Sequence, residues 1–167
     1  LENQLETAVK QKEVPFFVAG TSGTTVRGAY DPIGELLRLR ERFGFWLHID
    51  GAWGGAVLVS DTLRKIYMEG VDQVDSLTWD FHKMLGTSLI CNIFLVNKRP
   101  RILGKTVSSE DESYIFHGDS GPGSGEVRDL GAVSLQCGRR VDSLKWFLDW
   151  KFYGKKEFAR RVESALE

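Results

Sequence analysis

The sequence has the length and composition of one ordinary globular domain. Its 167 residues are 42% hydrophobic, which is enough to bury a core and excludes a disordered chain. The 22 lysines and arginines nearly balance the 23 aspartates and glutamates, so the net charge of −1 makes nucleic acid and anionic membranes poor candidate partners.

Targeting and metal-binding signals are absent from the sequence pattern. No apolar run approaches the roughly 18 residues of a membrane-spanning helix, and residues 1–13 do not resemble a signal peptide, so a cytoplasmic location is expected. Cys91 and Cys137 are too few for a disulfide scaffold, and no cysteine or histidine spacing is typical of zinc, so no metal site is predicted. Because the first residue is a leucine within a helix-like segment, we expect the chain to be a fragment.

The first half of the chain alternates strands with helices. The apolar run VPFFVAG at 14–20 predicts a strand that follows a polar helical segment and enters the loop TSGTT. Asp31 is expected to be the N-cap of a helix with Pro32 at its first position and Gly44 at its end. The run FWLHID at 45–50 predicts a second strand.

The alternation continues with one more helix and two more strands. A helix is expected near 61–69, with Ser60 or Asp61 as its cap and Gly70 at its end. DSLTW at 75–79 and ICNIFLV at 90–96 predict the third and fourth strands. The pattern predicts an α/β domain with a largely parallel sheet, in which the last two strands could also be antiparallel.

The last third is expected to be a long loop followed by helix. Residues 105–126 are polar and rich in glycine, which is typical of a functional or mobile loop. The segment RRVDSLKWFLDWKFYG predicts a helix whose apolar positions Val141, Leu144, Leu148 and Phe152 face the core. The charged segment beyond it predicts a solvated helix.

Asp50 and Lys83 are the first candidates for chemistry. In open α/β sheets ligands bind beyond the carboxyl ends of strands; Asp50 is the last residue of the second predicted strand, and Lys83 follows the third. Either alone is more often structural, because an aspartate at a strand end commonly caps the next turn. As a pair they match pyridoxal phosphate, which needs a lysine for its Schiff base and a carboxylate that keeps the pyridine nitrogen protonated.

Five motifs extend this pair into a family resemblance. VPFFVAGTSGTT, GAYDP, WLHIDGAWGG, SLTWDFHKMLG and LQCGRRVD occur in an order and spacing that resemble the group II pyridoxal-phosphate decarboxylases of fold-type I. Within this family, a tryptophan at position 53 is similar to the pattern of the branch that includes glutamate and cysteine-sulfinate decarboxylases. The resemblance implies an incomplete fold-type I large domain, a mostly parallel sheet with flanking helices. Residues 1–154 would be its central part, and 155–167 a helix leading toward a missing C-terminal small domain.

The resemblance also implies cofactor-binding roles for matching residues. Lys83 would form the Schiff base, Asp50 would pair with the pyridine nitrogen, and Ala52 would pack on one face of the ring. Thr21 would lie close to the aspartate and the cofactor. His82, directly before the lysine, would lie near the phosphate.

One further catalytic residue is implied by the long loop. The segment SYIFHGD aligns Tyr114 with a tyrosine that the family places on a mobile loop. There it is implied to return a proton to the substrate carbanion after carbon dioxide has left. Lys83, Asp50 and Tyr114 are therefore the expected catalytic residues.

The sequence departs from the family pattern in three ways. Asp80 and Phe81 replace an asparagine and a proline; because Asp80 could oppose the charge of the cofactor phosphate, we predict that it faces away. Gly51 replaces an alanine. The upstream phosphate-binding loop and the histidine that stacks on the ring do not occur in this chain, so the fragment alone is expected to bind the cofactor poorly.

The resemblance implies decarboxylation of a small acidic L-amino acid, of the glutamate, aspartate or cysteine sulfinate type, to an amine and carbon dioxide. It also implies a homodimer with the active site at the subunit interface. Two alternatives remain open. Asp50 and Lys83 fix the cofactor but not the bond that breaks, so one alternative is another lyase or an aminotransferase. The other is a catalytically inactive paralogue or fragment that serves only for assembly. His48, two residues before Asp50 on the same strand face, is expected to be a satisfied core histidine or a support for the site.

Overall fold

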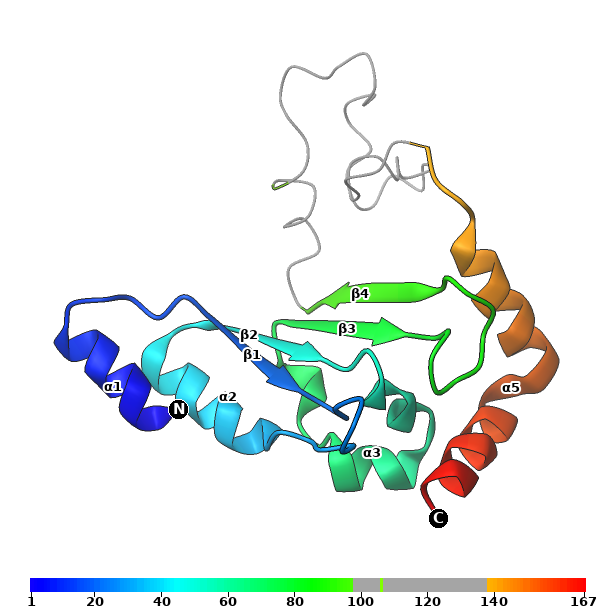
Figure 1. The fold of residues 1–167 in the computed structure, drawn as a ribbon, viewed down its shortest axis with the longest axis horizontal. Helices are drawn as coiled ribbons and strands as arrows, with labels where there is room; N and C mark the ends of the chain where they lie inside the picture. Colours follow the sequence, from blue (N-terminus) through cyan, green and yellow to red (C-terminus); the bar gives the residue numbers. More distant parts are fainter. Residues whose placement is uncertain (98–105, 107–137) are drawn as a thin grey trace, which may run out of the picture. The chain divides into compact units, whose positions relative to one another are not determined.

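The computed structural model describes residues 1–97, 106 and 138–167. The chain divides into two compact units, one formed by residues 1–97 and 141–167 and the other by residues 98–140. The fold and the candidate site below belong to the first unit (Figure 1).

A four-stranded sheet forms the centre of this unit. The strands β1 (Phe17–Thr21), β2 (Trp46–Asp50) and β3 (Ser76–Asp80) are parallel neighbours, and β4 (Asn92–Val96) pairs with β3 in the antiparallel direction. The predicted α/β class with a parallel start is therefore confirmed, and the last pair of strands is antiparallel.

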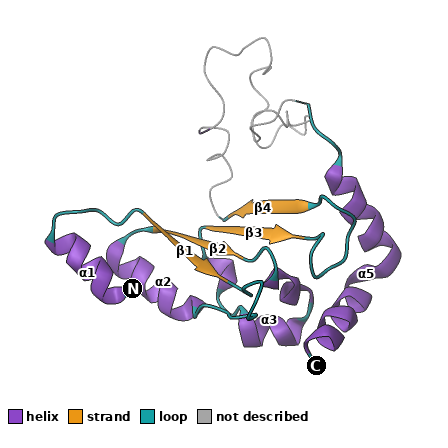
Figure 2. Cartoon of the chain, in the orientation of Figure 1, coloured by secondary structure: helices purple, strands orange, loops and turns teal. Residues whose placement is uncertain are grey.

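Helical segments connect and flank the strands. They are α1 (Glu2–Lys10), α2 (Ile33–Phe43), η1 (Gly54–Val59), α3 (Asp61–Tyr67), η2 (Val71–Gln73) and α5 (Asp142–Leu166). Figure 2 shows α1, α2 and α3 along one side of the strands. Within the described part of the chain, no helix is both long enough and apolar enough to cross a membrane.

The core lies between one face of the sheet and the helices. Leu47, Ile49 and Leu77 on that face are buried, and Leu36 of α2 and Val57 of η1 are buried with them. Alternation along the strands sends their neighbours to the opposite face, where Phe17 and Phe94 are about half exposed.

Two predicted helix ends are confirmed and two are wrong. Gly44 ends α2 in the left-handed conformation, and the Ser60 hydroxyl caps α3 by accepting the Leu63 amide at 3.2 Å. Asp31 is not the N-cap of α2: Pro32 occupies that position, because the Asp31 carboxylate accepts the Thr21 amide instead. Helix α3 ends at Tyr67, and Gly70, with φ +83°, is the N-cap of η2.

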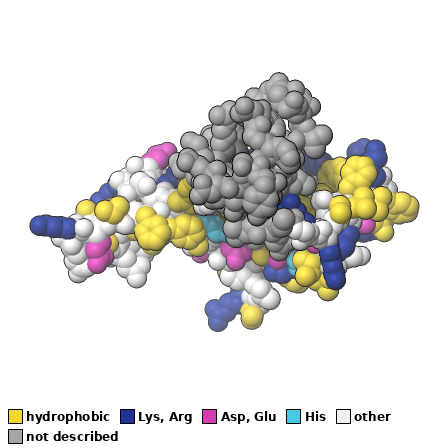
Figure 3. Space-filling model, turned by 90° about the horizontal axis from the view of Figure 1, so that it is seen from above, with side chains coloured by type: hydrophobic (Ala, Val, Ile, Leu, Met, Phe, Trp, Pro, Cys, Tyr) yellow, Lys and Arg dark blue, Asp and Glu magenta, His cyan; other side chains and the backbone are white. Residues whose placement is uncertain are grey.

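The prediction for the last helix chose the wrong face. In the described structure Leu144, Leu148 and Phe152 are 49%, 56% and 81% exposed, and Figure 3 shows hydrophobic side chains gathered over α5. The buried contacts come from the other side, through Trp146, and through Phe158 beyond the kink at Gly154. The alternating aromatic residues give α5 two apolar faces, and periodicity alone could not choose between them.

The end of α5 packs more tightly than a solvated helix would. Phe158 and Val162 are almost fully buried, and the Ser60 hydroxyl donates to the Glu163 carboxylate. The prediction of a solvated helix is therefore wrong on this face, although the exposed pair of Lys155 with Asp61 fits it on the other. The boundary at residues 154 and 155, and the small domain beyond it, stay predictions.

Two loops that follow parallel strands touch through glycines. A Cβ built on Gly54 would lie 2.4 Å from the Ser22 carbonyl oxygen and 2.7 Å from the Gly23 Cα, both backbone atoms that cannot move aside easily. Gly23 itself has φ +82°, which favours glycine. The Tyr30 hydroxyl donates to the Gly54 carbonyl at 3.1 Å and closes the same contact.

Replacing Gly54 with alanine should therefore destabilise the protein by about 2–4 kcal/mol, because the methyl group would separate the two loops. Urea unfolding of the full protein measures this loss. Gly34→Ala in α2 is the matched control, since a Cβ there meets no atom within 4 Å and should stabilise the helix by about 0.5–1 kcal/mol. Equal stability of the two variants would contradict the packing described here.

Candidate active site

The carboxyl ends of three parallel strands bring the candidate residues to one edge of the sheet. Thr21 pairs with Asp50, and Asp50 pairs with Thr78. Paired residues of parallel strands direct their side chains to the same face, and Asp80 follows Thr78 by two positions on that face. The predicted site residues Thr21 and Asp50 are thus neighbours.

The loop after β2 holds the Asp50 carboxylate. Asp50 Oδ1 accepts the Ala52 amide at 3.0 Å, and the Gly51 amide donates to the Thr78 carbonyl at 2.9 Å. A Cβ on Gly51 would lie 3.0 Å from Leu77 Cδ1 and 3.2 Å from the Thr78 oxygen, so this turn favours the small residue. Among the described residues, Asp50 Oδ2 has no hydrogen-bond partner and faces solvent.

Thr21 is fixed by the residue that was expected to cap α2. The Thr21 amide donates to Asp31 Oδ2 at 2.7 Å, and the Asp31 amide donates to the Thr21 carbonyl at 2.9 Å. The next amide, that of Ser22, donates to the Asp50 carbonyl at 2.8 Å. The first strand end is therefore tied to the second through the main chain.

Lys83 lies in the turn that follows β3, and its amine contacts Asp80. Lys83 Nζ is 2.9 Å from Asp80 Oδ2, and the Lys83 amide donates to the Asp80 carbonyl at 3.3 Å. The Asp80 amide donates to the Ala52 carbonyl at 3.3 Å, while the Ala52 amide binds Asp50. Ala52 therefore links the carboxylate of Asp50 to the turn that carries Lys83.

The sequence did not indicate the partner of Asp80. Its carboxylate contacts Lys83 and lies 4.0 Å from His82 Nε2. The expectation that Asp80 faces away from a cofactor phosphate stays a prediction. The spacing of three residues between an acid and a lysine was the signal that could have predicted this pair.

His82 is held by Cys91 in the same turn. Its Nδ1 lies 2.8 Å from the Cys91 carbonyl oxygen and 3.0 Å from the Cys91 amide nitrogen, so it can donate to the first or accept from the second, according to the tautomer of the ring. The Cys91 carbonyl also accepts the amides of Phe81 and His82. The other ring nitrogen, Nε2, is the one nearest to Asp80.

Phe81 anchors this turn to the core. Its ring stacks on Trp146 of α5, with centroids 4.2 Å apart, and meets Trp79 edge to face at 4.8 Å. Cys91, which is buried, donates its Sγ proton to the Asp142 carbonyl at 3.3 Å. Phe81 and Cys91, which flank Lys83 in sequence, thus both fix the turn against α5.

His48 makes the hydrogen bonds of a satisfied histidine. The Ser76 hydroxyl accepts the Trp46 indole proton at 2.8 Å, and it lies 2.8 Å from His48 Nδ1, to which it can give its own proton. The Phe17 and Phe94 rings flank the imidazole on the outer face of the sheet. Partial burial lowers the pKa of His48, and it outweighs the opposing effect of the Asp50 charge.

Tyr114 lies outside the described residues, as does Cys137. The proton-donor role expected for Tyr114 therefore stays a prediction. The same holds for the long loop expected at 105–126.

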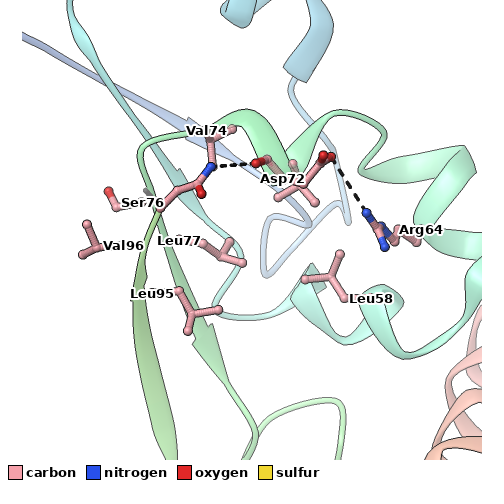
Figure 4. A pocket seen from close by; sticks show the side chains of 10 residues that line it. Leu58, Arg64, Asp72, Val74, Ser76, Leu77, Leu95 and Val96 are labelled. Carbon is pink, nitrogen blue, oxygen red and sulfur yellow. Dashed lines mark hydrogen bonds and ion pairs between the residues drawn. The ribbon is translucent and has the colours of Figure 1, made fainter. Parts of the chain in front are cut away.

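A groove of about 370 Å³ lies at the other end of β3 and is not part of this site (Figure 4). It is lined by Ser76 and Leu77 at the start of β3, with Leu95 and Val96 at the end of β4. Its walls are mainly apolar, and none of its lining residues is at the carboxyl end of a parallel strand. The candidate active-site residues and this groove are therefore separate.

The pKa of the His48 imidazole should lie below its ordinary value of 6.5. Since the folded state favours the neutral ring, the stability that His48 contributes is present above the unfolded pKa and is lost as the pH falls through the folded pKa. An NMR titration of the ring protons measures this pKa, and a His48→Gln variant should lose less stability on acidification. A midpoint at or above 6.5 would contradict this account of the burial.

Comparison with known proteins extends over the whole chain. The family model described as the pyridoxal-dependent decarboxylase conserved domain matches residues 1–167. Human cysteine sulfinic acid decarboxylase is 41% identical over 166 residues, which are 99% of this chain and 33% of that protein. An L-aspartate decarboxylase of Metarhizium robertsii is 40% identical over 160 residues, 96% of this chain and 31% of that protein.

Solved structures agree with this match. The crystal structure of mouse CSAD in apo form has a TM-score of 0.84 and 36% identity, covering 99% of this chain and 33% of that one. The Oryza sativa TDC structure with PLP and tryptamine has a TM-score of 0.81 and 30% identity, covering 95% and 31%. These likenesses confirm the expected fold-type I domain. The chain spans about a third of these relatives, and it belongs to the pyridoxal-dependent decarboxylase family.

Proposed function

We propose that the protein carrying this chain is a pyridoxal-phosphate-dependent decarboxylase that converts a small acidic L-amino acid to an amine and carbon dioxide. The observation that carries the proposal is the link through Ala52. Its amide donates to the Asp50 carboxylate, and its carbonyl accepts the amide of Asp80, where the turn with Lys83 begins. A carboxylate and an amine on adjacent strand ends are the two groups that this cofactor needs.

The chemistry of the side chains present fits the cofactor. Asp50 is exposed and carries a carboxylate, Lys83 has a primary amine on a side chain that is about one third exposed, and His82 has a ring nitrogen, Nε2, that is not used in its contact with Cys91. These groups suit a pyridine nitrogen, an aldehyde carbon and a phosphate, respectively. Ala52 adds a small apolar surface beside Asp50. When bound, pyridoxal phosphate supplies an electron sink for the charge that develops at the substrate Cα.

Each residue would then have a defined part in the reaction. The negative charge of Asp50 would keep a proton on the pyridine nitrogen, because opposite charges stabilise each other. Lys83 would hold the cofactor through its amine and release it to the substrate amine. Thr21 would support the Asp50 end, and we propose Tyr114 as the donor of the proton to Cα.

Support for an acidic substrate comes from the relatives. Their names give cysteine sulfinic acid, acidic amino acids and L-aspartate as substrates. Each of these molecules carries a second acidic group on a short side chain. Glutamate shares this chemistry and belongs to the proposed class.

Assembly and location are part of the proposal. By resemblance to its family, the protein would be a cytoplasmic homodimer with the active site at the subunit interface, and it would have no nucleic-acid or membrane partner. Residues 155–167 would lead into a C-terminal small domain. Light scattering of the full protein measures the assembly directly.

The covalent role of Lys83 is tested by borohydride reduction of the full protein with pyridoxal phosphate. Mass spectrometry should find the pyridoxyl group on Lys83, and Lys83→Ala should abolish this label together with the activity. If the label falls on other lysines and not on Lys83, the proposed cofactor site is wrong and an inactive paralogue becomes the better interpretation.

Replacing Asp50 with asparagine should lower the decarboxylation rate about 100-fold or more, because a neutral amide does not keep the pyridine nitrogen protonated. Asp61→Asn is the matched control, since that carboxylate is exposed on α3 and should leave the rate unchanged. Products from aspartate, glutamate and cysteine sulfinate are identified in the same assay. An amine with carbon dioxide supports the proposal, whereas a keto acid favours an aminotransferase.

A further inference from the structure

The contact between Asp80 and Lys83 has a consequence beyond the proposed function. We infer that Asp80 is a positioning residue: its carboxylate holds Nζ of Lys83 in an ion pair at the strand ends and restrains its attack on an aldehyde until this ion pair opens. The inference depends on the proposed function only for the identity of that aldehyde.

Burial distinguishes this ion pair from the other lysine pairs in the described part of the chain. The Asp80 side chain is 12% exposed, whereas Asp142, which pairs with Lys145 at the same sequence spacing, is 35% exposed. Asp61, the partner of Lys155, is 83% exposed. Because water screens exposed pairs strongly, the charge of Asp80 acts on its lysine more than that of Asp61 does.

The main chain fixes the carboxylate before any ligand arrives. The Asp80 amide is bonded to the Ala52 carbonyl, and the Asp80 carbonyl accepts the Lys83 amide. The ring of the next residue, Phe81, is buried between Trp79 and Trp146. Because the backbone at Asp80 is already fixed, its contact with Lys83 Nζ costs little further conformational entropy of the backbone.

Two side-chain nitrogens face the same carboxylate. Lys83 Nζ lies 2.9 Å from Asp80 Oδ2, and His82 Nε2 lies 4.0 Å from it. Both come from the turn after β3, and neither is paired with Asp50 in the described structure. The strand ends therefore carry two carboxylates with separate partners, Asp50 bound by an amide and Asp80 bound by the lysine.

The chemical effect follows from the lone pair of the amine. An ammonium has three N–H donors and no lone pair, so it cannot attack a carbonyl carbon. Lys83 must first give one proton to solvent. Its nitrogen can then form a bond to the aldehyde carbon, and the carbonyl oxygen leaves as water as the C=N bond forms. Because Nζ must leave the ion pair with Asp80 before it can reach the aldehyde carbon, this contact slows the attack.

The test is competitive labelling of amines with acetic anhydride at pH 8, on the full protein freed of cofactor. In Asp80→Asn, the rate of Lys83 acetylation should rise about three- to tenfold relative to Lys155, a range reduced to allow for the partial exposure of Lys83. Asp80→Glu keeps the charge and should label like the wild type. Peptide mass spectrometry reads all lysines in one sample.

Controls separate charge from disturbed folding. Asp61→Asn removes the exposed partner of Lys155 and should change the labelling of that lysine less than about twofold. Circular dichroism checks each fold, and Asp80→Ser replaces Asp80→Asn if the latter does not fold. An unchanged or slower rate at Lys83 in the folded neutral variant would overturn the inference.

Reduction with borohydride in the presence of pyridoxal phosphate separates this inference from the proposed function. If acetylation of Lys83 accelerates in Asp80→Asn while the cofactor never attaches to Lys83, Asp80 controls the amine and the proposed function fails. If the cofactor attaches to Lys83 but the acetylation rates of wild type and variant agree, the proposed function stands and the role of Asp80 is refuted.

Discussion

The parallel register of β1, β2 and β3 is the constraint on which the candidate site depends. It sets Thr21 beside Asp50 and Asp50 beside Thr78, so three loops leave the sheet at one edge. A shift of one residue would send the Asp50 side chain to the helix-covered face, where a carboxylate would be costly to bury. The buried Leu47 and Ile49 specify the register against this shift.

Close contacts between the loops turn this alignment into a defined site. The contact of Gly23 with Gly54 joins the first two loops, and the two backbone bonds of Ala52 join the second to the third. Each contact uses main-chain atoms, whose positions vary less than those of long side chains. The loops that carry Asp50 and Lys83 are thus located relative to each other without a bound ligand.

The sequence predicted the elements well and their contacts less well. Short apolar runs located the four strands of the described structure, and Asp50 and Lys83 could be selected because they lie at or beyond strand ends and match a cofactor's chemistry. The Asp31 carboxylate, however, could accept either the first amides of α2 or the amide of Thr21, and the sequence rules for helix capping consider only the first. The apolar face of α5 was misassigned for a related reason: Trp146 and Leu144 both fit a helical period, and only Phe81, distant in sequence, selects Trp146.

Phe81 shows how this chain can keep its turn rigid without a proline. A proline would restrict φ directly, whereas Phe81 restricts the turn through burial, which contributes about 1.5–3 kcal/mol for a side chain of this kind. Its stacking on Trp146 makes that contribution depend on α5 being in place. The geometry around Lys83 is therefore coupled to α5. If α5 lost its packing, the position of the Lys83 amine would change first, through Phe81, whereas Asp50 is held by the loop after β2.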